Sequence, residues 1–294
     1  MKIVNYGSMN IDNVYAVDHM ARPGETLLAE KRSVFCGGKG LNQSIAIAKA
    51  GGQVYHAGIL GEDGEMLLDA LNQNGVNTGY IRRAQGPSSH TVIQVDRTGQ
   101  NSIIVFGGEN MRPTEADIDH ILEGFGPDDA VILQNELYHS PLMMKKAAEK
   151  GMCVIFNPSP VNAGLSEYPL ESVTWFLLNE IEGEALTGQK EPERILDGLE
   201  AKYPRASVVL TLGEKGAYCR HGGRTVFQPA FAVKAVDTTA AGDTFTGYFV
   251  SGLAAGKPLD EVMRRAARAS SIAVGRMGAA DSIPLACEVD AAEA

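Results

Sequence analysis

The sequence predicts an α/β fold in which parallel strands are connected by crossover helices. Short apolar runs with β-strand character alternate with longer helical patterns along the chain. These pairs are IVNY with LNQSIAIAKA, VYHAGIL with EMLLDALNQ, AVILQ with PLMMKKAAEK, and SVTWFLLN with EIEGEALTG. The 294 residues, 44% hydrophobic and 21% charged, have the composition of a globular protein with one large domain or two smaller ones.

Several helices carry recognisable start signals. Thr114 and Asp117 have the spacing of a capping box, and Ser140 is the expected N-cap before Pro141 at the first helical position. The last predicted helix has a core-facing apolar stripe made of Leu259, Val262, Met263, Ala266 and Ala267.

Residues 13–36 and 88–107 interrupt the alternation because they contain strand patterns without helices. In the second stretch, TVIQV and SIIVF flank the turn 96–100, which predicts a hairpin. We expect the two stretches to form a small separate sheet that covers a ligand. The alternative is that they extend the main sheet at its edge.

The net charge of −10 argues against nucleic-acid and membrane partners, because phosphodiester backbones and anionic lipids would repel the chain. No apolar run approaches the length of a membrane span, and the N-terminus lacks signal-peptide character, so we expect a cytoplasmic protein. The four cysteines show no zinc-ligand spacing and no disulfide pattern, which predicts reduced, mostly buried thiols.

Polar residues follow several predicted strands, and the carboxyl ends of parallel strands meet at one edge of a sheet. These residues are Asn10 and Asp12 after the first strand, Gln134, Glu136, Asn157, Asn179 and Thr211. Ligands of open α/β sheets bind at that edge, so we expect these side chains to line one crevice. Any one of them has the alternative role of capping the next helix.

The segment from Ala235 to Gly256 predicts an anion site. A strand-like Ala-Val pair is followed by a turn of small residues at 240–243 and then by a helix. Small side chains let backbone amides approach a ligand, and the helix N-terminus adds partial positive charge, which favours phosphate. The alternative for Asp243 is a charge that merely stabilises the helix start.

The segment from Phe35 to Gly51 places consecutive glycines before a helix. Lys39 and Asn42 lie near the helix start, where an ammonium and an amide can hydrogen-bond vicinal hydroxyls. A solvated helix start is the alternative. The chain contains no GxxxxGK[ST] motif and no GxGxxG after the first strand, which argues against P-loop enzymes and nucleotide-dependent dehydrogenases.

Over nearly its whole length the sequence resembles the ribokinase, or PfkB, family of sugar kinases. The resemblance is carried by GGKGLNQ, GILGEDGE, NEIE, TLGEKG and DTTAAGDTFTG, in that order. It implies a ribokinase-like three-layer α/β/α sandwich with a mainly parallel central sheet and a small β lid. The implied main domain comprises residues 1–12, 37–87 and 108–294, and the lid residues 13–36 and 88–107.

The resemblance also implies functional residues. Asp243 matches the family's catalytic base, and the amides of Ala240, Ala241, Gly242 and Asp243 match its anion hole. Residues matching nucleotide and magnesium positions are Asn179, Glu182, Thr211, Gly213 and Gly216. Residues matching sugar-hydroxyl positions are Asn10, Asp12, Gly38, Lys39, Asn42, Glu136 and Asp243. Residues matching a shell for an activating potassium ion are Asp237, Thr239, Ala273, Arg276, Gly278 and Ser282.

The implied reaction is ATP-dependent phosphorylation of a sugar hydroxyl, with ATP, Mg²⁺ and K⁺. The GGKG and NQ motifs resemble those of the ribose kinases more than those of fructokinases or ketodeoxygluconate kinases, which favours D-ribose and ribose 5-phosphate. Leu41, Glu109 and Ala267 depart from the family pattern. Alternatives are a nucleoside, hexose or keto-sugar kinase and a silent sugar-binding regulator. The lid strands suggest a homodimer through the lid.

Overall fold

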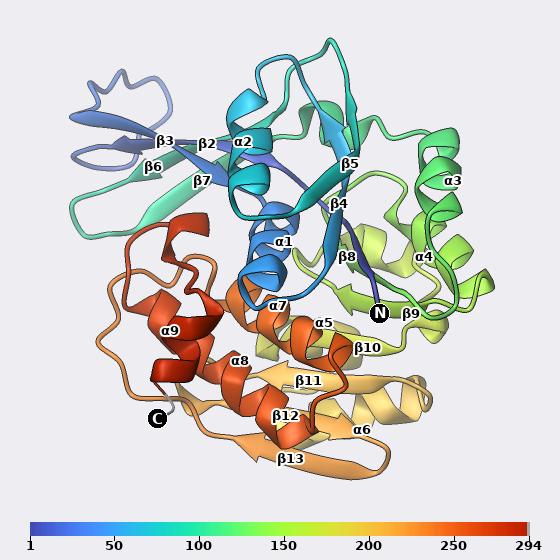
Figure 1. The fold of residues 1–294 in the computed structure, drawn as a ribbon. Coiled ribbons are helices and arrows are strands. Elements are labelled where there is room, and N and C mark those ends of the chain that lie inside the picture. Colours follow the sequence, from blue (N-terminus) through green and yellow to red (C-terminus); the bar gives the residue numbers. More distant parts are fainter. Residues whose placement is uncertain (293–294) are drawn as a thin grey trace.

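The main body of the protein is a nine-stranded sheet, as seen in the computed structural model, which describes residues 1–292 (Figure 1). In spatial order the strands are β13 (Arg224–Gln228), β12 (Ala217–His221), β11 (Ser207–Thr211), β10 (Trp175–Asn179), β9 (Cys153–Asn157), β8 (Ala130–Gln134), β1 (Ile3–Tyr6), β4 (Val54–Leu60) and β5 (Asn77–Arg83). The strands from β11 to β5 run parallel, and an antiparallel hairpin of β12 and β13 completes one edge. The predicted α/β fold is confirmed.

Helices cover both faces of this sheet and create two apolar cores. One face carries α1 (Lys39–Lys49), α2 (Glu65–Gln73), α7 (Ala241–Ala254), α8 (Leu259–Val274) and α9 (Ala286–Ala291); the other carries α3 (Glu115–Glu123), α4 (Ser140–Glu149), α5 (Glu180–Thr187) and α6 (Pro192–Lys202). Successive strand residues point to opposite faces, so Ile3 packs in the first core and Val4 in the second. The result is a three-layer sandwich.

The segments without helices form a separate four-stranded sheet, which we call the lid sheet. Its strands, in order, are β3 (Lys31–Gly37), β2 (Asn10–Ala16), β6 (Ser89–Val95) and β7 (Asn101–Phe106). The hairpin of β6 and β7 is confirmed, and the alternative of an extended main sheet is not observed. In Figure 1 the lid sheet projects from the main body beside the N-terminal end of α1.

Two glycines bring α1 against the end of β1. A Cβ at position 40 would stand 2.4 Å from the carbonyl carbon of Gly7, and one at position 7 would stand 2.5 Å from Gly40 Cα. Because both neighbours are backbone atoms, neither position accepts a larger residue without displacement of the chain. This close approach fixes the start of α1 above the sheet edge.

The helix starts agree with the sequence only in part. The capping box of Thr114 and Asp117 is confirmed. The prediction that Ser140 is an N-cap is wrong, because Ser140 is already helical and its hydroxyl donates to the Leu137 carbonyl. The cap is instead His139, whose left-handed backbone (φ 62°) turns the chain into α4.

Two further differences concern the C-terminal third. Ala235 and Val236 form no strand, because the backbone of Val236 bonds to the end of α8 at Val274 and not to a neighbouring strand. The stripe that begins at Leu259 does lie on α8, but α8 is followed by the short helix α9, which is too brief to show a periodic pattern.

The cysteines are free, as expected, but they are less buried than predicted. Cys219 is buried, Cys36 and Cys153 are half-buried, and Cys287 is exposed on α9. Within residues 1–292, no helix combines the length and apolar character that a membrane crossing requires.

Candidate functional site

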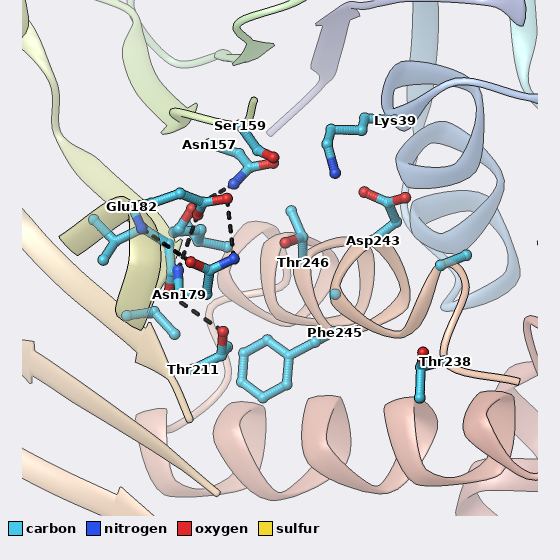
Figure 2. A pocket seen from close by; sticks show the side chains of 15 residues that line it. Lys39, Asn157, Ser159, Asn179, Glu182, Thr211, Thr238, Asp243, Phe245 and Thr246 are labelled. Carbon is cyan, nitrogen blue, oxygen red and sulfur yellow. Dashed lines mark hydrogen bonds between the residues drawn. The ribbon is translucent and has the colours of Figure 1, made fainter. Parts of the chain in front are cut away.

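Polar side chains gather at the carboxyl edge of the main sheet, as the sequence predicts. Gln134, Asn157, Asn179 and Thr211 are the last residues of β8, β9, β10 and β11. A cavity of about 250 Å³, here called the α7 cavity, opens there between the strand ends and the start of α7. Its lining includes Lys39, Asn157, Ser159, Asn179, Glu182, Thr211, Thr238, Ala240, Gly242, Asp243, Phe245 and Thr246 (Figure 2).

Asp243 lies at one end of the α7 cavity, in the first turn of α7, and its side chain is held by two amides from α1. Asn42 Nδ2 donates to Oδ2 at 3.1 Å, and Gln43 Nε2 donates to Oδ1 at 2.9 Å. Only 8% of the Asp243 surface is exposed. The carboxylate is therefore fixed in orientation and still accessible from the cavity.

The turn before Asp243 presents unpaired backbone amides. Among residues 1–292, the N–H groups of Ala240, Gly242 and Asp243 have no hydrogen-bond acceptor, while that of Ala241 bonds Thr238 O at 3.3 Å. Ala240 has a left-handed backbone (φ 60°), a conformation that costs an alanine about 1–2 kcal/mol. Strained backbone of this kind is typical of ligand-binding turns. Together with the positive end of α7, these amides can bind an anion.

Lys39 lines the α7 cavity on the same side as Asp243, and its ammonium points towards that carboxylate (Figure 2). The negative charge of Asp243, and to a lesser extent that of Glu136, raises the pKa of Lys39 above its ordinary value, so its ammonium stays protonated. Burial raises the pKa of Glu136, although the Lys39 charge and a hydrogen bond from the Ser8 hydroxyl oppose this rise. Glu136 also accepts a hydrogen bond from the Lys39 amide at 3.2 Å.

A second cavity of about 590 Å³, the lid cavity, lies between the lid sheet and the turn after β8. Asn10 and Glu136 both line it, and Glu136 links it to Lys39 of the α7 cavity. Asn10 and Asp12 follow β1, as expected, and both belong to β2, because the chain enters the lid sheet at Asn10.

Three of the expected sugar-binding residues, Asp12, Gly38 and Asn42, are not in the lining of either cavity. Asp12 accepts a hydrogen bond from Thr91 at 2.7 Å, and burial raises its pKa. Gly38 caps α1 with a left-handed backbone (φ 95°), where a Cβ would meet the Ser8 carbonyl oxygen at 2.9 Å. Asn42 lines neither cavity, and its Oδ1 is buried without a hydrogen-bond donor among the described residues.

The expected nucleotide residues lie at the other end of the α7 cavity. Asn179 and Glu182 form a capping box at the start of α5, with Glu182 Oε2 accepting from the Asn179 amide at 2.9 Å. Asn179 therefore caps the next helix, which is the alternative role of these strand-end residues, and both Asn179 and Glu182 also line the cavity. Thr211 lines it too, whereas Gly213 and Gly216 lie in the turn to β12, outside the lining.

The residues expected to hold a monovalent cation come from two segments that the fold brings together. Asp237 Oδ2 accepts from the Gly278 amide at 3.1 Å, and its Oδ1 accepts from the Thr239 amide at 2.9 Å. Although burial acts to raise it, these hydrogen bonds hold the pKa of Asp237 below its usual value. The guanidinium of Arg276 donates to Glu288 Oε1 at 2.5 Å. The group of Arg276 that can bind a cation is therefore its backbone carbonyl. The carbonyl of Ala273 accepts a hydrogen bond from the Arg276 amide at 3.0 Å, and both Ala273 and Ser282 are buried.

Sequence reasoning missed the roles of Gln43 and Asn110, and it placed Gln134 at this sheet edge without finding its contact to Gln43. Gln43 holds Asp243, and Gln134 holds Gln43 through a 2.7 Å hydrogen bond. Asn110 donates to Asn10 at 2.9 Å, while its own Oδ1 is buried without a donor among the described residues. The signal for Gln43 is its place beside Asn42 on α1. Asn110 lies in the FGGEN segment, which departs from the family pattern and so gives no signal.

The chain matches known proteins over nearly its full length. Residues 1–286 match the model described as pfkB family carbohydrate kinase. A ribokinase of Haemophilus influenzae is 33% identical over 95% of this chain and 94% of its own. A deoxyribokinase of Salmonella typhimurium is 31% identical over 97% of this chain and 96% of its own.

A solved structure gives the same relationship. Arabidopsis thaliana ribokinase, in a complex with ribose and ATP, is 32% identical and superimposes with a TM-score of 0.88 over 99% of this chain and 97% of that chain. The resemblance expected from the sequence motifs is confirmed, and so is the ribokinase-like fold. The chain belongs to the pfkB family of carbohydrate kinases.

Proposed function

We propose that this chain is an ATP-dependent ribokinase, which transfers the γ-phosphoryl group of ATP to the 5-hydroxyl of D-ribose. The observation that carries the proposal is the buried Asp243 carboxylate, held by two amides beside a turn with unpaired backbone N–H groups. Full-length similarity to ribokinases supports the choice of sugar.

In the proposed mechanism Asp243 accepts the proton of the attacking hydroxyl. Phosphoryl transfer asks a protein mainly for alignment and for stabilisation of charge on the transferring group. In this mechanism the unpaired amides of Gly242 and Asp243 and the ammonium of Lys39, which lines the same cavity, would stabilise that charge. Asn42 Oδ1 and Asn110 Oδ1, both buried without donors among the described residues, can accept hydrogen bonds from the sugar hydroxyls.

Magnesium and the nucleotide phosphates fit the far end of the α7 cavity. Glu182 is a buried carboxylate there, and oxygen ligands with intervening waters suit this ion. When bound, Mg²⁺ neutralises charge on the phosphates. Glu182 and Asn179 would hold it, and Thr211 would lie against the nucleotide.

A monovalent cation such as K⁺ fits the turn between Asp237 and Gly278. The Asp237 carboxylate and the carbonyls of Ala273, Arg276 and Gly278 are oxygen donors in adjacent segments. Thr239 and Ser282 complete the proposed shell. A cation here would brace the turn that leads into Ala240, so its effect on turnover would act through the anion-binding amides.

The lid sheet supports a homodimer. Ile103, Ile104, Val105 and Phe106 on the edge strand β7 are each at least half exposed. An unpaired apolar edge of this kind favours pairing with a second copy. Light scattering at micromolar concentration should give the mass of a dimer, and the mass of a monomer would refute the proposed homodimer.

The proposed requirement for ATP and the free cysteines favour action in the cytoplasm.

The test is ADP formation from ATP and Mg²⁺ across D-ribose, 2-deoxy-D-ribose, D-fructose, a hexose and a nucleoside, each with and without K⁺. We expect turnover with ribose, raised by K⁺. Preference for 2-deoxyribose would keep the kinase and replace the sugar, an outcome that the deoxyribokinase relative makes worth measuring. Sugar binding without turnover on any acceptor would favour the silent regulator and refute the proposal.

A further inference from the structure

A chain of buried polar side chains runs beneath Asp243, away from both cavities. Its members are Gln43, Gln134, Asn5, Ser44 and His56, none more than 1% exposed. Buried polar groups are costly unless they are hydrogen-bonded, and fully bonded networks fix side-chain positions. The chain ends on a carboxylate that the proposed mechanism uses, so its orientation has consequences for the reaction.

The orientation of each amide in this chain follows from one backbone carbonyl. Asn5 Nδ2 donates to Gly40 O at 2.8 Å, and a carbonyl oxygen can only accept, so the Asn5 amide cannot be reversed without losing this bond. Asn5 Oδ1 therefore faces Gln134 and requires a donor. Gln134 Nε2 supplies it at 3.1 Å.

The same argument carries on to the carboxylate. Gln134 Nε2 also donates to Gln43 Oε1 at 2.7 Å, which leaves Gln43 Nε2 to point at Asp243 Oδ1, 2.9 Å away. Asn157 provides a second check. Its Nδ2 donates to Leu177 O at 2.9 Å, so its Oδ1 accepts from Gln43 Nε2 at 3.3 Å. The hydrogen bonds to Gln134 and to Asn157 therefore require the same orientation of the Gln43 amide.

The residues of this hydrogen-bonded series that lie farthest from Asp243, Ser44 and His56, are consistent with these donor and acceptor assignments. Asn5 Nδ2 donates to Ser44 Oγ at 2.9 Å, and Ser44 lies 2.8 Å from His56 Nδ1. Burial lowers the pKa of His56 to about 4, so the ring is neutral and its Nδ1 can accept while Nε2 donates to Gly7 O. Gln134 Oε1 is buried without a donor among the described residues, so this orientation of the Gln134 amide leaves one acceptor unsatisfied.

We propose that Gln43 is a positioning residue for Asp243, and that Gln134 and Asn5 impose its donor orientation from the Gly40 carbonyl. The proposal rests on the proposed role of Asp243 as the base. By donating to Oδ1, Gln43 fixes the rotamer of the carboxylate and directs the other oxygen, Oδ2, which also accepts from Asn42, to the sugar side. It does not itself touch the reacting atoms.

The first test is Gln43→Met, which keeps the side-chain length and removes the amide. A hydrogen bond to a charged group is lost, so we expect kcat to fall about 10- to 100-fold, with a much smaller change in KM for the sugar. Lys39 and Glu136, the other charged groups that interact with Asp243, are both retained in this variant.

The second test is Gln134→Met, alone and combined with Gln43→Met. Gln134 contacts Asp243 only through Gln43, so the single variant should also lower kcat, but by a smaller factor. The double variant should match Gln43→Met, because the second loss has no path left to the carboxylate. Independent, multiplicative effects on kcat would overturn the relay.

A matched control separates positioning from folding. Ser207 bonds His221 at 2.7 Å at the opposite end of β11, far from this chain. Ser207→Ala should lower Tm and leave kcat and the sugar KM unchanged. If Gln43→Met behaves like Ser207→Ala, the positioning role is refuted. If Asp243→Asn, run in the same assay, keeps normal turnover, the proposed function fails first.

Discussion

Gly247→Ala should lower both stability and kcat, because it disturbs the packing of α7 against α1. Gly247 lies on α7 against α1, and a Cβ there would stand 2.3 Å from Ala46 Cβ and 2.8 Å from Ile47 N. Ordinary carbon contacts are about 3.5–4.0 Å, so the shortfall exceeds about 1 Å. Neither neighbouring atom can rotate away, because one is a backbone nitrogen and the other a methyl fixed to the backbone. Helix α1 must therefore move away from α7.

The movement has a calculable cost. Overpacking costs about 1–3 kcal/mol, and the better helix propensity of alanine returns about 1 kcal/mol. The difference is a net loss of up to about 2 kcal/mol, which corresponds to a Tm lowered by up to about 8 °C. The same displacement lengthens the contacts of Asn42 and Gln43 with Asp243, which are now 3.1 and 2.9 Å. Misplacement by about 1 Å is enough to reduce kcat about 100-fold.

Steady-state kinetics and a thermal melt test this prediction, with Gly252→Ala as the matched control. Gly252 is on the same helix, and its Cβ would meet Val262 Cγ2 at 2.9 Å on α8, away from α1. The control should lower Tm and spare kcat. If Gly247→Ala lowers Tm and retains normal kcat, the packing of α1 on α7 does not set the geometry of the carboxylate.

Two further predictions concern groups outside the cavities. His56 has a folded-state pKa of about 4 against 6.5 when unfolded, so the unfolded chain binds the proton first as pH falls. Its contribution to stability is complete above pH 6.5 and decreases by up to about 3 kcal/mol towards pH 4. Urea unfolding of His56→Gln should lack this part of the pH dependence, and equal slopes for both proteins would contradict it. Asp237→Asn should raise the K⁺ concentration for half-maximal activation at least about tenfold, a loss of about 1.4 kcal/mol. Asp281→Asn, a change at a nearby exposed carboxylate, should not, and an equal effect of the two would remove Asp237 from the cation site.

The fold was predictable where local signals and tertiary packing agree. The strand and helix pairs have strong periodicity, and Thr114 and Asp117 form a capping box that needs only local sequence. The sequence predicts the N-cap of α4 at Ser140, one residue too late, because the left-handed turn at His139 has no sequence signal. It predicts a strand at Val236 because a short apolar pair carries no information about the segment that it bonds to.

The site residues likewise fall into those that local motifs identify and those that only tertiary contacts bring into place. Asp243 and Lys39 stand in distinctive motifs next to glycines, so the sequence identifies them. Gln134 comes from a strand end 91 residues from Gln43 in the sequence, and only the parallel order of β1 and β8 brings it under α1. Asn110 depends on the lid sheet for its place beside Asn10. Contacts made through tertiary structure leave no local pattern to detect.

The most direct test of the central claim is Asp243→Asn, measured for both kcat and ribose affinity. Asparagine keeps the shape of the side chain but cannot accept the hydroxyl proton as a carboxylate does. General-base catalysis contributes about 10²–10⁴-fold, so kcat should fall by about that factor while the ribose dissociation constant changes little. A variant that turns over ribose at the normal rate would contradict the assignment of Asp243 as the base.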